Sequence, residues 1–151
     1  MDYWDTSALL KLYAPESDSP RFLDLAATSS GALGTADVAA VELICSLERK
    51  EQAGDLRDGG AEVLFQRFET DVQAGRIVLV PYGREVWSEV KRLVDTAYRH
   101  RGKQVVMVRS LDAIHIATAL SMKAAFVIAT DKRLRQAAAL VGLKLAPAKV
   151  H

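Results

Sequence analysis

Residues 3–6 (Tyr3-Trp4-Asp5-Thr6) and residues 127–131 (Val127-Ile128-Ala129-Thr130-Asp131) end in the same way, on an aspartate beside a threonine. Each is an apolar run with the length and composition of a short buried strand. In parallel α/β sheets, the carboxyl ends of the strands open into the crevice where ligands bind. The two aspartates are therefore candidates for a site at that edge of a sheet.

The rest of the chain alternates between strand-like and helix-like patterns. The aliphatic run 77–80 predicts a strand buried on both faces, and weaker patterns predict strands at 31–34 and 144–146. Longer helices are predicted at 37–53, 84–101, 111–123 and 131–141. This alternation predicts a parallel sheet with helices on both faces, as a single domain over residues 1–151.

Composition limits the classes of protein to consider. Of the 151 residues, 50% are hydrophobic and 26% are charged, and the net charge is +1. Binding to nucleic acid would therefore depend on a local positive surface. No apolar run approaches the ~20 residues of a membrane span, and the N-terminus lacks the basic region of a secretion signal. With a single cysteine, Cys45, which cannot form an internal disulfide, these features predict a soluble cytoplasmic protein with no membrane contact.

Two more acids lie in predicted helices. Apolar residues cover almost the whole circumference of the helix 37–53, which predicts a core helix. Its narrow polar strip holds Glu42 and Arg49, so Glu42 either pairs with Arg49 or faces a site. Asp112 lies in the first turn of the helix 111–123, where the helix dipole alone would favour an ionised carboxylate.

The four acids together favour a metal site. Asp5 and Asp131 also have a purely structural alternative, since each could simply cap the helix that follows it. Clustered carboxylates, however, repel one another and raise each other's pKa unless a cation neutralises them. Oxygen ligands suit Mg²⁺ or Mn²⁺, which can polarise a phosphoryl oxygen and activate water. The histidines are His100, His115 and His151, so the thiols and clustered imidazoles of a zinc site are missing.

Four segments carry these acids and span nearly the whole chain. They are Asp5-Thr6-Ser7-Ala8-Leu9-Leu10-Lys11-Leu12-Tyr13, Val41-Glu42-Leu43, Leu111-Asp112-Ala113-Ile114-His115-Ile116-Ala117-Thr118-Ala119 and Ala129-Thr130-Asp131-Lys132-Arg133-Leu134. In this order, they resemble the PIN-domain family, and most of all the VapC-type toxins of bacterial toxin–antitoxin pairs.

The resemblance implies a three-layer α/β/α fold around a central, mainly parallel sheet of four to five strands. It also implies a Mg²⁺-dependent endoribonuclease, with Mn²⁺ as an alternative cofactor, that cleaves RNA phosphodiester bonds with a metal-activated water. The residues that match the family's catalytic and metal-binding acids are Asp5, Glu42, Asp112 and Asp131. Thr6 and Thr130, which adjoin two of these acids, are expected to support them.

The resemblance further implies partners. A free ribonuclease would harm its host, so we expect a small antitoxin protein, and a homodimer is also expected from the family. The apolar N-terminal helices at Leu9–Tyr13 and Phe22–Leu25 are the expected landing place for the antitoxin. The candidates for RNA contact are the basic residues Arg99, Arg101, Lys103 and Arg109. The alternative for the first three is that cations at a helix C-terminus complement its dipole.

Other assignments stay open at this point. His115, one helical turn after Asp112, could orient a ligand, although a histidine donating to a backbone carbonyl is commoner. A PIN-like fold could act as a non-catalytic RNA- or protein-binding module, but the retention of all four acids argues against that. A receiver domain or a haloacid-type phosphatase needs further acids after its first strand. This chain has Asp5-Thr6-Ser7 there, which fits neither.

Overall fold

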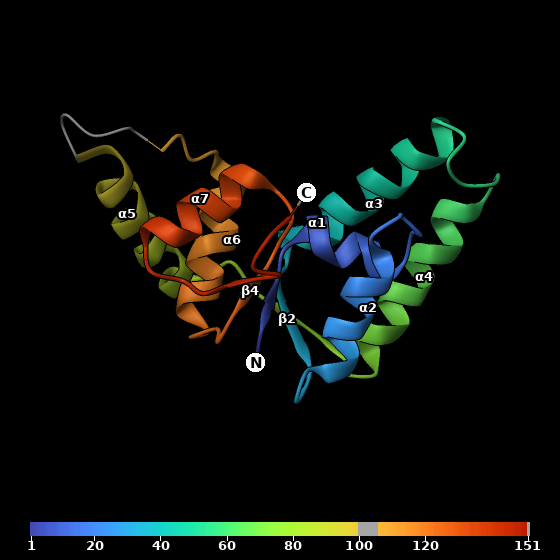
Figure 1. Cartoon of the computed structure of the whole chain (residues 1–151), viewed down its shortest axis with the longest axis horizontal. Helices are drawn as coiled ribbons and strands as arrows, with labels where there is room; N and C mark the ends of the chain where they lie inside the picture. Colours follow the sequence, from blue (N-terminus) through green and yellow to red (C-terminus); the bar gives the residue numbers. More distant parts are fainter. Residues whose placement is uncertain (100–105, 151) are drawn as a thin grey trace.

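A five-stranded sheet runs through the middle of the molecule (Figure 1). The computed structural model describes residues 1–99 and 106–150. The strands are β1 (Tyr3–Trp4), β2 (Leu33–Ala36), β3 (Ile77–Val80), β4 (Val127–Ile128) and β5 (Leu145–Ala146). They lie in the order β3-β2-β1-β4-β5, and every neighbouring pair is parallel. The predicted sheet of four to five mainly parallel strands is confirmed.

Helices cover both faces of the sheet, which gives the three predicted layers (Figure 1). One layer holds α1 (Thr6–Leu9), the 3-10 helix η1 (Leu10–Leu12), α2 (Ser19–Thr28), α3 (Val38–Gln52) and α4 (Gly60–Gln73). The other holds α5 (Arg84–Arg99), α6 (Ser110–Ser121) and α7 (Lys132–Leu140). The helix predicted at 84–101 is present as α5 up to Arg99, and its last two predicted residues lie outside the described residues.

The alternation of side chains along the short strands builds a core on each face. Tyr3 packs in the hydrophobic cluster of α5, α6 and α7, whereas its neighbour Trp4 packs in the cluster of α1 to α4. Val127 and Ile128 on β4 divide between the two clusters in the same way. Because successive side chains of a strand point to opposite faces, two residues are enough to anchor both layers.

The parallel order gathers chain segments at one edge of the sheet. β1 leads directly into α1, β2 into α3 and β4 into α7, so the N-termini of these helices lie at the carboxyl ends of their strands. Asp5 is the N-cap of α1 and Asp131 is the N-cap of α7. The fold therefore brings together residues that lie more than a hundred positions apart.

Three expectations about burial are wrong. The helix at 37–53 is not buried all round, because only one face of α3 packs on the protein, and Val41 on the other face is 61% exposed. Cys45 is exposed as well. The strand at 77–80 is not buried on both faces, since β3 forms an edge of the sheet and only Ile77 is buried.

The expected landing place of a partner is exposed only in part. Leu9, Tyr13 and Phe22 are all buried in the core beside Trp4, whereas Leu23 on α2 is 49% exposed. The three buried side chains of the N-terminal helices are used for packing in the core. Within residues 1–99 and 106–150, no helix combines the length and the apolar character needed to cross a membrane.

Candidate functional site

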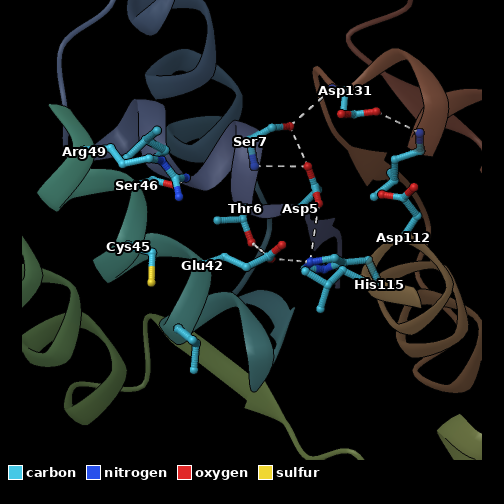
Figure 2. Close-up of a pocket in the computed structure, with 14 residues that line it drawn as sticks. Asp5, Thr6, Ser7, Glu42, Cys45, Ser46, Arg49, Asp112, His115 and Asp131 are labelled. Atoms are coloured by element: carbon cyan, nitrogen blue, oxygen red, sulfur yellow. Dashed lines mark hydrogen bonds and ion pairs between the residues drawn. The ribbon is translucent and has the colours of Figure 1, made fainter. Parts of the chain in front are cut away.

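Four carboxylates line one cleft at the carboxyl edge of the sheet (Figure 2). Asp5 follows β1, Glu42 belongs to α3, Asp112 to the first turn of α6, and Asp131 follows β4. The cleft has a volume of about 560 Å³. Its remaining lining residues are Thr6, Ser7, Leu10, Val41, Cys45, Ser46, Arg49, Leu111, His115 and Leu134. All four acids selected in the sequence thus border the same space.

Asp5 is the most deeply buried of these acids, with 4% of its surface exposed. Its Oδ2 accepts hydrogen bonds from the backbone N–H of Ser7 at 3.0 Å and from the Ser7 hydroxyl at 2.5 Å. Burial raises the pKa of Asp5, although His115 and the two hydrogen bonds from Ser7 oppose this effect. Among the described residues, no lysine or arginine pairs with Asp5. A buried carboxylate in this position would gain from a bound cation.

Ser7 joins the ends of two neighbouring strands. While its hydroxyl donates to Asp5, its Oγ accepts the backbone N–H of Thr130 at 3.0 Å and that of Asp131 at 3.4 Å. The sequence analysis did not select Ser7 as a site residue. The available signal was its place two residues after an N-cap aspartate, where serine commonly closes a local turn.

Glu42 is held from two sides. Its Oε2 accepts a hydrogen bond from the Thr6 hydroxyl at 2.6 Å, and Nε2 of His115 lies 2.6 Å from the same atom. Burial alone would raise the pKa of Glu42, but the hydrogen bond and charge of His115, with Thr6, outweigh it and lower the pKa. Arg49, the expected alternative partner of Glu42, instead donates to Ser46 at 2.8 Å.

His115 lies between the acids and the core. It is only 2% exposed, and its Nε2 is also 3.7 Å from Oδ1 of Asp5. Its Nδ1 forms a hydrogen bond with the Tyr3 hydroxyl. The expectation of a backbone carbonyl as its partner is therefore wrong, because both ring nitrogens contact side chains of the site or of β1.

Asp112 and Asp131 also act as helix caps. Asp112 Oδ2 accepts the backbone N–H of Arg109 at 3.3 Å. Asp131 Oδ1 accepts the backbone N–H groups of Arg133 at 2.8 Å and Leu134 at 3.0 Å. Capping, the structural alternative stated for Asp5 and Asp131, is thus realised in both, and Asp112 caps its helix as well. Asp112 and Asp131 each use one carboxylate oxygen for it. Their other oxygens have no hydrogen-bond donor among the described residues.

The donor set suits a hard cation. Within residues 1–99 and 106–150, no three His, Cys, Asp or Glu side chains lie close enough together, in their present conformations, to coordinate a metal ion. Glu42 is turned toward His115, and two of the aspartates are turned toward helix N-termini. The cleft nevertheless offers carboxylate oxygens from four segments, and Arg49 is the one lysine or arginine among the described residues that line it. Among the described residues, the buried Asp5 has no lysine or arginine partner, and its carboxylate fits Mg²⁺ or Mn²⁺.

The other selected residues lie outside the cleft. Thr130 contributes its backbone N–H to Ser7 and does not line the cleft. Arg99 is exposed and pairs with Asp95 at 3.3 Å, and Arg109 is exposed at the start of α6. Arg101 and Lys103 lie outside the described residues.

Comparisons with known proteins agree with this fold. FitAcB from Neisseria gonorrhoeae superimposes with a TM-score of 0.68 at 21% identity, covering 96% of each chain. VapBC2 from Rickettsia felis, bound to a DNA fragment from their promoter, superimposes with a TM-score of 0.62 at 13% identity, covering 96% of this chain and 97% of the other. No curated protein matches the sequence. The family profile of the PIN domain matches residues 3–140, which is most of the sequence. The chain therefore belongs to the PIN domain family.

Proposed function

We propose that this protein is a metal-dependent endoribonuclease and the toxin of a VapBC-type toxin–antitoxin pair. The observation that carries the proposal is the convergence of four carboxylates from four distant segments on one cleft, with Arg49 as the single arginine among the described residues that line it. Membership of the PIN domain family supports it, because proteins of this family are typically metal-dependent nucleases.

Asp5, Glu42, Asp112 and Asp131 would hold the cation, Mg²⁺ or Mn²⁺. When bound, it would supply charge to polarise a phosphoryl oxygen and to lower the pKa of a water molecule. The acids would need to be ionised, and their neighbours favour this: the Ser7 hydroxyl donates to Asp5, while Thr6 and His115 contact Glu42.

The basic side chains near the cleft would bind the substrate backbone. Arg49 lines the cleft and is exposed, so its guanidinium can reach a phosphate next to the acids. Arg99 and Arg109 remain proposed RNA contacts, and so do Arg101 and Lys103, which lie outside the described residues. Such contacts would add affinity without base specificity and would weaken as salt concentration rises.

A protein partner would cover the cleft. Val41 and Ile44 are exposed on α3 next to Glu42, and this apolar strip is our proposed antitoxin contact, in addition to the exposed Leu23 on α2. The likeness in fold to VapBC2 supports a partner of this kind. A homodimer also remains a proposal.

Cleavage of RNA by partner-free protein tests the proposal. Purified protein is incubated with total cellular RNA in Mg²⁺ or in EDTA, beside the variants Asp5→Asn and Asp112→Asn. Asp37→Asn is the matched control, because Asp37 also sits at a helix N-terminus but is exposed and does not line the cleft. We expect discrete fragments from wild type and Asp37→Asn in Mg²⁺, and none in EDTA or from the other two variants. Folded wild-type protein that binds RNA without cutting it would instead identify a non-catalytic binding module.

A further inference from the structure

A chain of polar groups runs from the buried Tyr3 hydroxyl to the cleft, and Figure 2 shows its cleft end, where His115 lies beside Asp5 and Glu42. The Tyr3 hydroxyl on β1 forms a hydrogen bond with Nδ1 of His115 on α6, and Nε2 of His115 contacts Glu42 on α3. Tyr3 is 0% exposed and His115 is 2% exposed. Three elements from both sides of the sheet are thus linked through side chains alone.

The partners determine which atoms carry the protons. An ionised carboxylate has only acceptors, so Nε2 of His115 donates to Glu42. In the neutral imidazole, Nδ1 then carries no hydrogen and accepts the hydroxyl proton of Tyr3. In the imidazolium, Nε2 still carries a proton. Glu42 therefore keeps this donor in either state, and Tyr3 fixes the orientation of the ring.

This arrangement exceeds what packing requires. Tyr3 lies in the hydrophobic cluster formed with α5, α6 and α7, where apolar side chains would fill the space without polar atoms to satisfy. A buried polar pair of this kind adds little net stability compared with apolar residues of similar volume. The chain of polar groups instead ends at Oε2 of Glu42, which contacts Nε2 of His115. This Nε2 atom is also 3.7 Å from Oδ1 of Asp5.

We propose that Tyr3 and His115 are positioning residues that hold the Glu42 carboxylate at the cleft beside Asp5, from where it takes part in binding a divalent cation. Both ring nitrogens of His115 already have partners, so His115 acts through Glu42 and is not itself a ligand. This inference rests on the proposed function. Groups that orient metal-binding carboxylates typically change metal affinity or activity by about 10–100-fold when they are replaced.

Binding of Mn²⁺ alone, without RNA, tests the inference. Free Mn²⁺ is followed by its electron paramagnetic resonance signal during titration of metal-free protein. We expect His115→Leu to weaken Mn²⁺ binding by about 10–100-fold, and Tyr3→Phe to weaken it by about 10-fold, at the lower end of that range. His115→Gln keeps an N–H donor for Glu42 and is expected to recover part of the affinity.

A matched control separates positioning from stability. Tyr13→Phe also removes a buried phenol hydroxyl, which donates to Asp71 Oδ2 at 2.7 Å far from the cleft. Both tyrosine variants should lower Tm, but only Tyr3→Phe should weaken Mn²⁺ binding. In the cleavage assay, Tyr3→Phe should raise the Mg²⁺ concentration needed for half-maximal rate and leave KM for RNA unchanged.

The results of the Mn²⁺-binding experiment distinguish failure of the inference from failure of the proposed function. If wild type binds Mn²⁺ and Tyr3→Phe binds it equally well, the inference is overturned and the proposed function stands. If wild type binds no Mn²⁺, the inference and the proposed metal centre both fail. If His115→Leu does not fold, the conservative Tyr3→Phe variant decides, because it keeps the ring and loses one oxygen.

Discussion

Removal of the Ser7 hydroxyl should weaken the link between the ends of β1 and β4. In Ser7→Ala, Asp5 loses a hydroxyl donor at 2.5 Å and the backbone N–H of Thr130 loses its acceptor at 3.0 Å. A hydrogen bond to a charged group contributes roughly 1.5–3 kcal/mol and a neutral one roughly 0.5–1.5 kcal/mol. We therefore expect the free energy of unfolding to fall by about 2–4 kcal/mol. For a domain of this size, that corresponds to a fall in Tm of roughly 5–15 °C.

Urea and thermal unfolding of metal-free protein, measured at a pH above the raised pKa of Asp5, report this loss. Ser46→Ala is the matched control, since Ser46 lines the same cleft but only accepts a hydrogen bond from the exposed Arg49. We expect the control to change stability by about 0.5 kcal/mol or less. In an Asp5→Asn background, Ser7→Ala should cost about 1 kcal/mol less, because the charged acceptor is gone. Equal stability of Ser7→Ala and Ser46→Ala would refute the role assigned to Ser7.

Three further predictions concern charged groups. Burial raises the pKa of Asp5 above its ordinary value, so the metal-free protein should lose stability as pH rises through that raised pKa. Tm measured against pH in EDTA should show this loss in wild type and not in Asp5→Asn. The Asp5→Asn variant should also lack the increase in Tm that Mg²⁺ gives to wild type. Burial alone would raise the pKa of Glu16, but hydrogen bonds from Lys11 and Lys50 outweigh it and lower the pKa. The ionised Glu16 therefore stabilises the protein above pH 4.5, and this stabilisation is lost as pH falls through the lowered pKa. Glu16→Gln should reduce the fall in stability in this pH range, and an unchanged dependence of stability on pH would contradict this. Arg135 is buried and donates to the backbone carbonyls of Ala129, which follows β4, and of Pro147, which follows β5. Arg135→Met should therefore lower the free energy of unfolding by about 2–4 kcal/mol and speed hydrogen exchange in the C-terminal segment. Unaltered exchange there would contradict this role of Arg135.

Local patterns predicted the elements well, and burial less well. The apolar run that starts at Val127 and the helix predicted at 131–141 both have clear patterns, and they exist as β4 and α7 with slightly different ends. The exposure of Val41 was not predictable, because hydrophobicity around α3 does not say which neighbours the fold supplies. The edge position of β3 depends on strand order, which a run of aliphatic residues does not encode.

The site was predictable where chemistry coincides with local pattern. Asp5 and Asp131 end buried strands, and Glu42 interrupts an apolar helix, so each is visible in its own segment. Ser7 and His115 were undervalued because their partners are remote in sequence: Thr130 is 123 positions from Ser7, and Tyr3 is 112 positions from His115. Hydrogen bonds over such separations are properties of the fold and leave no mark in a local window.

The most direct test of the metal centre is anomalous diffraction from crystals of the partner-free protein soaked in Mn²⁺. The account predicts an anomalous peak within coordination distance of Asp5 and at least one more of the four acids, and its absence from crystals of Asp5→Asn. A peak elsewhere on the surface, or none in crystals of folded wild-type protein, would contradict the assignment of this cleft as a divalent-metal nuclease site.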